Sequence, residues 1–172
     1  MKKILASLFI LLSITVFSAE KIAIERVEVK EEKVYLKGQQ TPFTGVVEKK
    51  YPNGRVEATL EVKDGKLNGK TFVYSEDGKV KKEENYINGL MEGVERAYYP
   101  SGKLRGKEVQ KLGKREGESI IYHENGNIKQ KSTFKNDKRE GDLFIYFPSG
   151  KLRQTEKYIN GKIEGEVIEY YE

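Results

Sequence analysis

Glycine recurs at an interval of 24 residues from position 45 onward, and this interval constrains the fold more than any other feature of the chain. Three glycine series keep the interval, and only Asp137 takes the place of a glycine. The series are Gly45, Gly69, Gly93, Gly117, Gly141 and Gly165; Gly54, Gly78, Gly102, Gly126 and Gly150; and Gly65, Gly89, Gly113 and Gly161. A fixed period of this length is typical of repeat proteins, whose units stack on their neighbours. Residues 45–172 therefore hold five full copies and one half copy of one unit.

Each copy has the pattern of a β-hairpin. Residues of β-branched and aromatic type follow the first glycine, as in KTFVYS from Lys70 to Ser75. A triplet such as PNG, EDG or PSG then predicts a tight turn, because its glycine accepts a positive φ. A second strand of about eight residues leads to Asp-Gly or Asn-Gly, at 64–65, 88–89 and 160–161, which reverses the chain again. The pattern predicts an all-β fold, an elongated single-layer array of antiparallel β-hairpins.

The N-terminal residues have the layout of a secretory signal peptide. Two lysines precede an apolar run from Ile4 to Phe17, which is followed by Ser18 and Ala19. We expect residues 1–19 to be removed and the protein to be exported to the periplasm, the cell surface or the medium. An uncleaved amphipathic anchor is the alternative.

Residues 20–44 differ from the array and are expected to cap its first hairpin with one or two strands, Ile22 to Val29 and Val34 to Leu36. The chain has no cysteine, so neither a disulfide nor the acylated cysteine of a lipoprotein is available. The expected divisions are a signal peptide (1–19), capping strands (20–44) and the repeat array (45–172).

Composition argues against nucleic-acid binding and catalysis. The net charge is only +5, whereas nucleic-acid binders concentrate far more positive charge. The single histidine, His123, occupies the position that Tyr51, Tyr99 and Phe147 hold in other copies, and it has no cysteine or second histidine beside it. We interpret it as a substituted aromatic residue, and we expect no enzymatic activity, no cofactor and no bound metal.

One row of candidate binding residues is aromatic. Alternate strand residues share a face, so equivalent residues of successive copies align. This row contains Tyr74, Tyr98, Tyr122 and Tyr146, with Phe72, Ile120 and Phe144 two residues earlier in their copies. The tyrosines are interpreted as the core of a thin sheet, or alternatively as an aromatic groove for a glycan or an extended peptide.

A second row of candidates is basic and is expected on the other face. It contains Lys81, Arg105, Lys129 and Arg153, with Lys107 and Lys131 two residues further on. One interpretation is a solvated face offset by the acidic row of Glu92, Glu116, Glu140 and Glu164. The other is a stripe that faces an anionic lipid or an envelope polysaccharide.

The strings YINGLMEG (86–93) and YINGKIEG (158–165), with PFTG (42–45) ahead of them, resemble MORN repeats. The resemblance covers residues 34–172 and is closest to the bacterial variant described as antitoxin-like. It implies an array of β-hairpins, and the lipid binding of eukaryotic relatives or an antitoxin role. The 24-residue copies and the absence of tryptophan depart from the standard motif.

We therefore expect an exported, non-enzymatic interaction protein that binds a protein partner or an envelope component. The alternatives are an antitoxin or immunity protein that neutralises a cognate toxin, and an adhesive protein that binds anionic lipid or glycan. The segment GEVIEYYE (165–172) contains the first strand of the half copy. Its edge is expected to pair with another chain, either a second copy or a partner strand.

Overall fold

The protein is described by a computed structural model that covers residues 21–172, and the expected signal peptide lies outside the described residues. Within this range the only helical element is one 3-10 turn, η1 (Ile24–Arg26). None of the helices in this range has the length and apolar character needed to cross a bilayer. The remaining elements are strands, so the predicted all-β class is confirmed.

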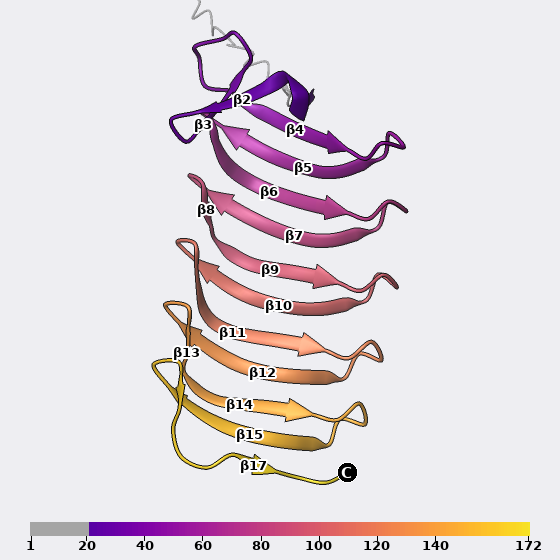
Figure 1. Ribbon diagram of the computed structural model, residues 1–172, viewed down its shortest axis with the longest axis vertical. Helices are drawn as coiled ribbons and strands as arrows, with labels where there is room; N and C mark the ends of the chain where they lie inside the picture. Colours follow the sequence, from indigo (N-terminus) through magenta and orange to yellow (C-terminus); the bar gives the residue numbers. More distant parts are fainter. Residues whose placement is uncertain (1–20) are drawn as a thin grey trace, which may run out of the picture.

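Five hairpins stack into one antiparallel sheet, as predicted, and Figure 1 shows them one below another in a column. The hairpins are β4 (Gly45–Lys50) with β5 (Val56–Lys63), β6 (Lys66–Tyr74) with β7 (Val80–Ile87), β9 (Gly93–Tyr98) with β10 (Leu104–Lys111), β11 (Lys114–Tyr122) with β12 (Ile128–Lys135), and β14 (Gly141–Tyr146) with β15 (Leu152–Ile159). The short strands β8 (Leu90–Met91), β13 (Lys138–Arg139), β16 (Lys162–Ile163) and β17 (Ile168–Glu169) complete the sheet. Strands that follow one another in sequence are also neighbours in space, so most contacts stay within one copy or between adjacent copies.

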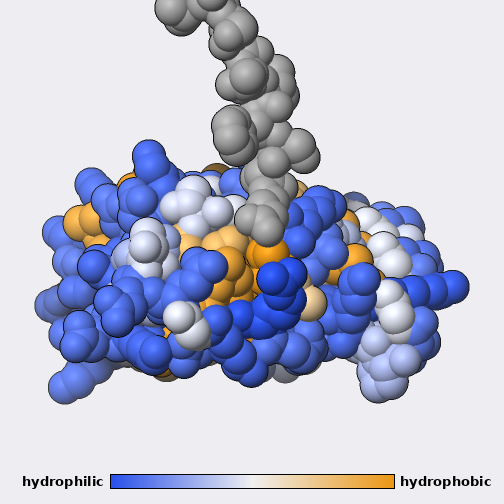
Figure 2. Space-filling view, turned by 90° about the horizontal axis from the view of Figure 1, so that it is seen from above, coloured by the Kyte–Doolittle hydropathy of each residue, from blue (hydrophilic) through white to orange (hydrophobic). Residues whose placement is uncertain are grey.

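The segment before the array packs on the first hairpin. Strand β1 (Lys21–Ala23) pairs with β4 in parallel, and β2 (Val27–Lys30) and β3 (Lys33–Leu36) form a separate two-stranded sheet. The η1 turn interrupts the strand expected from Ile22 to Val29, and it lets β1 and β2 belong to different sheets. Ile22 and Phe43 pack here against Val47 and Val62 in an apolar cluster. Figure 2 looks onto this end of the column and shows an apolar centre bordered by polar side chains.

The turns that lead from one hairpin to the next have two residues with positive φ, as in Asn88 (51°) and Gly89 (86°). A two-residue loop with this conformation is a type I′ turn, which matches the twist of the strands around it. Leu112, with φ of 51°, and Asn136-Asp137 adopt the same conformation, although the sequence at 112–113 carries no Asn-Gly or Asp-Gly signal. The strands on both sides pair along their lengths, and this pairing holds Leu112 in a conformation that leucine disfavours.

The two backbone N–H groups of each of these turns donate hydrogen bonds to residues just before the first glycine of the same copy, close to the preceding turn. The N–H of Asn88 donates to Oδ1 of Asn68 at 3.1 Å, and the N–H of Gly89 donates to the carbonyl of Leu67 at 2.8 Å. The same side-chain bond recurs in every copy, and its acceptors are Thr44, Asn68, Glu92, Glu116 and Glu140. The residue before the first glycine of a copy therefore caps the next turn.

In copies two and four the first strand begins directly after the preceding turn, at Lys66 in β6 and Lys114 in β11, whereas β9 and β14 begin at the first glycine of their copies. In β6 the glycine lies inside the strand, where the register shifts between Leu60 and Val62 of the neighbouring strand. Gly69 has a φ of 115°, and a Cβ on it would lie 2.0 Å from the carboxylate of Glu61. Gly69 is therefore favoured by its backbone conformation, and a larger residue would also have to displace the carboxylate of Glu61.

At the opposite edge, the loop within each hairpin also bonds to its neighbour. The Tyr51 hydroxyl donates to the carbonyl of Tyr74 at 2.7 Å, and the Tyr99 hydroxyl donates to the carbonyl of Tyr122 at 2.6 Å. In copy four, Nε2 of His123 lies 3.0 Å from the carbonyl of Tyr146. Since a carbonyl only accepts, Nε2 must carry the proton. His123 thus makes the bond that tyrosine makes at this position in copies one and three.

Candidate functional site: two open faces and a pocket

The sheet has two chemically different faces. We call the side that carries Phe72 and Tyr74 the tyrosine face, and the side that carries Thr71 and Glu84 the polar face, because cross-strand register separates these two pairs. In residues 21–172 the array from β6 to β15 forms one layer, and no second sheet covers either face. Both faces are therefore available to a partner.

The predicted tyrosines Tyr74, Tyr98, Tyr122 and Tyr146 lie on the tyrosine face and are half-buried. Tyr74 stacks on Phe72 with ring centroids 6.2 Å apart, and the Tyr98 hydroxyl donates to Glu83 at 3.4 Å. Burial, and then the charge of Glu83, raise the pKa of Tyr98. The four tyrosines are not part of the fully buried core, although Ile120 on the same face is 7% exposed and belongs to it.

The predicted basic residues share a local irregularity that the sequence did not reveal. In copy three, Ala97 pairs with Gly106 and Tyr98 pairs with Leu104, which leaves Arg105 as the extra residue of a β-bulge. The same shift recurs at equivalent places in the other copies. The four bulged residues are Lys81, Arg105, Lys129 and Arg153. We call them the basic row.

All four residues of the basic row are exposed, and none forms an ion pair within residues 21–172. The acidic row does not offset them, because Glu92, Glu116 and Glu140 cap turns at the other ends of the strands. Gln110 of β10 lies opposite Gly93, next to Glu92, and five residues after Arg105. At 3.4 Å per residue, Arg105 and Glu92 are therefore about 17 Å apart along the strand. Charges this far apart are screened at physiological salt, so the acidic row does not offset the positive charge of the basic row.

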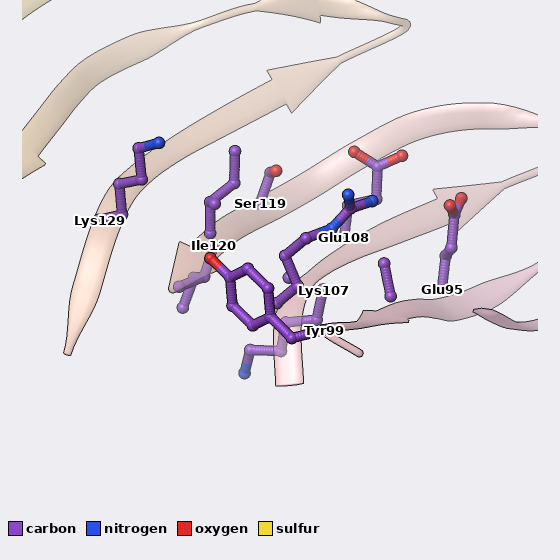
Figure 3. A pocket seen from close by; sticks show the side chains of 11 residues that line it. Glu95, Tyr99, Lys107, Glu108, Ser119, Ile120 and Lys129 are labelled. Carbon is purple, nitrogen blue, oxygen red and sulfur yellow. The ribbon is translucent and has the colours of Figure 1, made fainter. Parts of the chain in front are cut away.

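The bulge also separates residues that the sequence placed together. Lys107 pairs with Ile120 and Lys131 with Phe144, so both lysines belong to the tyrosine face. Lys131 forms an ion pair there with Glu118 at 2.8 Å. Figure 3 shows Lys107 pointing away from the side of the sheet to which Glu95, Glu108 and Ser119 point. The expected continuation of the basic row through these two lysines is therefore wrong.

The polar face carries buried polar side chains in the middle of the sheet. They are Thr71, Glu84, Gln110, Ser119 and Ser132. Cross-strand pairing extends this line of polar residues across copies three and four. Glu95 lies opposite Glu108, and Glu108 lies opposite Ser119. Two carboxylates directly opposite each other destabilise a sheet. Copy three thus contains an unfavourable pair that the fold does not require.

Lys82 compensates part of this negative charge. Its Nζ lies 2.5 Å from Glu84 and 2.7 Å from Glu95. Burial lowers the pKa of Lys82, but its hydrogen bonds to these two carboxylates outweigh burial and raise that pKa. Burial and the charge of Glu84 raise the pKa of Tyr86 to about 12, and its hydroxyl donates to Glu84 at 3.0 Å.

A pocket of about 500 Å³ opens on the polar face between copies three and four. Glu95, Glu108 and Ser119 line it together with Arg105 and Lys129, two members of the basic row. Figure 3 shows Lys129 and Glu95 at opposite ends, with Tyr99 between them. The pocket could not be predicted from the sequence, because its lining residues come largely from four strands and are brought together only by the strand register.

No group of three or more His, Asp or Glu side chains suited to a metal ion occurs in the described part of the chain. His123 makes its bond to a backbone carbonyl rather than to another titratable side chain. The expectation of a non-catalytic protein stays a prediction.

Four segments of the chain match a known family of protein repeats, described as "MORN repeat variant". They are residues 67–88, 91–111, 115–136 and 139–160. No curated protein matches the sequence. Among the solved structures that match is the "Crystal structure of GtfA/B complex bound to UDP and GlcNAc", with a TM-score of 0.26 and 12% identity. That match covers 76% of this chain and 23% of the other. Since the four segments span just over half of the 172 residues, and the hairpins of the structure coincide with them, the chain belongs to the MORN repeat variant family.

Proposed function

We propose that this protein is an exported, non-enzymatic interaction module whose open sheet binds a protein partner in the cell envelope or outside the cell. The observation that carries the proposal is the basic row, four exposed cations at equivalent positions with no ion pair in residues 21–172. MORN repeats are generally interaction modules, which supports the same conclusion. A partner with acidic groups at a spacing of about 10 Å, two strand widths, would fit the row.

Affinity capture with charge-reversed variants tests the proposal. The tagged full chain is cross-linked in its native cells, and bound proteins are quantified from the envelope and from the culture supernatant. The test variant is Lys81→Glu with Arg153→Glu. The matched control is Lys111→Glu with Lys135→Glu, two exposed lysines that line no part of the pocket and form no ion pair in residues 21–172. We expect a partner that the native chain and the control retain, and that the test variant loses by about tenfold or more. Equal capture by all three chains would refute the role of the basic row.

Export has its own test. The N-terminus of the protein isolated from the periplasm, the cell surface or the medium is expected to be Glu20. A chain that stays in the cytoplasm and keeps Met1 would refute this part of the proposal.

A second candidate function, binding of an anionic lipid or glycan, is supported by the four exposed cations of the basic row, which form no ion pair in residues 21–172. Binding to vesicles that contain anionic lipid should weaken with added salt and with Arg105→Glu and Arg153→Glu together. Binding that persists unchanged in this variant would exclude the basic row as the lipid contact. An antitoxin or immunity role would instead appear in the capture experiment as a toxic protein bound at the same row.

A further inference from the structure

Copy three differs from copies two and five at one position of the polar face. In copy two, Lys82 stands two residues before Glu84 and pairs with it at 2.5 Å. In copy five, Gln154 stands two residues before Glu156 and donates to it at 2.6 Å. Gly106 holds this position before Glu108, so copy three lacks the partner that the other two copies supply.

Glu108 consequently has little compensation. It accepts one hydrogen bond, from Nε2 of Gln110 at 2.9 Å, and the same nitrogen also bonds Glu95 at 3.3 Å. No Lys or Arg lies within ion-pair distance of Glu108 in residues 21–172. Burial, and then the charge of Glu95, raise the pKa of Glu108. A cation placed over Gly106 would form an ion pair with Glu108, as Lys82 does with Glu84.

A hydroxyl group lines the same space. Ser119 is 8% exposed, lies opposite Glu108 across the strands and lines the pocket. Its Oγ does not belong to the fully buried, unpaired side-chain atoms of residues 21–172, which include Thr71 Oγ1 and Ser132 Oγ, so the hydroxyl is open to the pocket. The pocket thus contains a polar group that a ligand could satisfy.

The other end of the pocket is basic. Arg105 and Lys129 line it, and neither forms an ion pair with Glu95 or Glu108. Three strand spacings, about 14 Å, separate Glu95 on β9 from Lys129 on β12. Arg105 and Glu108 both stand on β10, three residues or about 10 Å apart along the strand. An extended tripeptide, about 10 Å long, fits between the two ends.

We propose that this pocket binds a short zwitterionic peptide segment, with its ammonium group between Glu95 and Glu108 and its carboxylate at Arg105 and Lys129. Ala97, Gly106 and Ile121 form the apolar floor beneath the segment. The inference deepens the proposed function and rests on it, because Arg105 and Lys129 also belong to the basic row. Two sources have this chemistry: a free peptide with charged ends, and a protein segment with a lysine and a glutamate two residues apart.

Titration of the full ¹⁵N-labelled chain, followed by NMR, tests the site. The probes are trialanine, N-acetyl-trialanine, trialanine amide and acetyl-Lys-Ala-Glu-amide. We expect saturable shifts of the backbone amides of Gly106, Ser119 and Ile121 with trialanine. Removal of either terminal charge should weaken binding roughly fivefold or more. Tighter binding of acetyl-Lys-Ala-Glu-amide than of trialanine would identify a protein segment as the source, and the reverse would identify a free peptide.

Variants separate the site from a general charge effect. Glu108→Gln should weaken trialanine roughly fivefold and leave N-acetyl-trialanine unchanged, because the acetylated peptide has no ammonium group to lose. Glu118→Gln, on the tyrosine face of copy four, is the control and should change neither. Gly106→Lys should supply the missing cation internally, as Lys82 does in copy two, and should abolish binding of every probe. Its Cβ would lie 3.1 Å from the backbone carbonyl of Ile120, so the dispersion of the amide spectrum checks that the variant is folded.

Three results would overturn the inference: no saturable shift at roughly 10 mM of any probe, equal binding of the charged and capped peptides, or full binding by Gly106→Lys. These outcomes do not depend on the capture experiment, whose variant changes Lys81 and Arg153 outside this pocket. If the variant with Lys81→Glu and Arg153→Glu loses the captured partner but no peptide shifts the amide signals, the proposed interaction module stands and the peptide site is refuted.

Discussion

Substitution of Leu112 by asparagine should stabilise the protein. Leu112 is the first residue of the type I′ turn between β10 and β11, with a φ of 51°. Asp64, Asn88, Asn136 and Asn160 hold the equivalent position in the other copies, at φ values between 48° and 52°. Asparagine accepts this left-handed conformation because its short polar side chain bonds to the nearby backbone, whereas leucine gains nothing in return for the steric cost.

The expected gain follows from two opposing effects. The left-handed conformation costs a residue such as leucine about 1 to 2 kcal/mol, most of which asparagine avoids. The side chain of Leu112 is 66% exposed, so its replacement forfeits only about a third of the roughly 2 kcal/mol that full burial contributes. The backbone N–H of residue 112 keeps its bond to Glu92 in either case. The free energy of unfolding should therefore rise by roughly 0.5 to 1 kcal/mol.

Equilibrium unfolding in urea measures this difference, with thermal unfolding as a second readout. A gain of about 1 kcal/mol corresponds to a rise in Tm of about 2 to 4 °C for a domain of this size. The matched control is Asn88→Leu, which places leucine at the same turn position of copy two, where φ is also 51°. The free energy of unfolding of this control should fall by about as much as that of Leu112→Asn rises.

Either of two outcomes would refute the reasoning. Destabilisation by Leu112→Asn would mean that the contacts of the leucine outweigh its backbone strain. An Asn88→Leu variant as stable as the native chain would mean that the type I′ conformation does not discriminate between the two residues.

Three further predictions concern the hydrogen bonds and charges of single copies. Glu116→Ala removes the 2.8 Å acceptor of the Asn136 N–H and should lower the free energy of unfolding by about 1 kcal/mol in urea, a loss that Glu116→Gln largely avoids. His123→Phe should cost about 1 kcal/mol because the bond to the Tyr146 carbonyl is lost, whereas His123→Tyr should restore it; equal stability of the two variants would contradict this. Burial and a neighbouring carboxylate raise the pKa of Glu108 above the 4.5 of a free side chain. The folded state therefore binds this proton more tightly than the unfolded state. As pH rises from 4.5 through the raised pKa, the free energy of unfolding falls. Glu108→Gln should therefore be more stable than the native chain at pH 7 and nearly equal to it at pH 4, and parallel stability profiles would exclude this linkage.

The hairpins could be predicted from the sequence because their turns have strong local preferences. Asn-Gly and Asp-Gly specify a type I′ turn on their own, so Asn88-Gly89 marked a chain reversal that the structure confirms. Leu112-Gly113 has no such preference, and pairing of the adjacent strands holds it in the turn instead. The period of 24 residues located this turn even where its chemistry was atypical.

The faces could not be predicted equally well, because side-chain direction depends on register between strands. Strict alternation places Arg105 and Lys107 on one face, but the bulge at Arg105 interrupts the alternation, and the register puts Lys107 on the tyrosine face opposite Ile120. The acidic row illustrates a second limit. Glu92 lies 20 residues before the N–H that it caps, and this contact exists only once the copies have stacked. The pocket is of the same kind, since it arises where Gly106 lacks a side chain that other copies have.

The stacked turns give the array a direction of assembly. Each turn donates its two N–H groups to residues that the ribosome has already delivered, and the first turn finds its acceptors, Phe43 and Thr44, ahead of copy one. A new copy of 24 residues emerges in roughly 1 to 5 s at ordinary rates of synthesis and meets a finished template. The chain can thus lengthen by one rung at a time from its N-terminal end, and only the first turn depends on acceptors that lie outside the repeats.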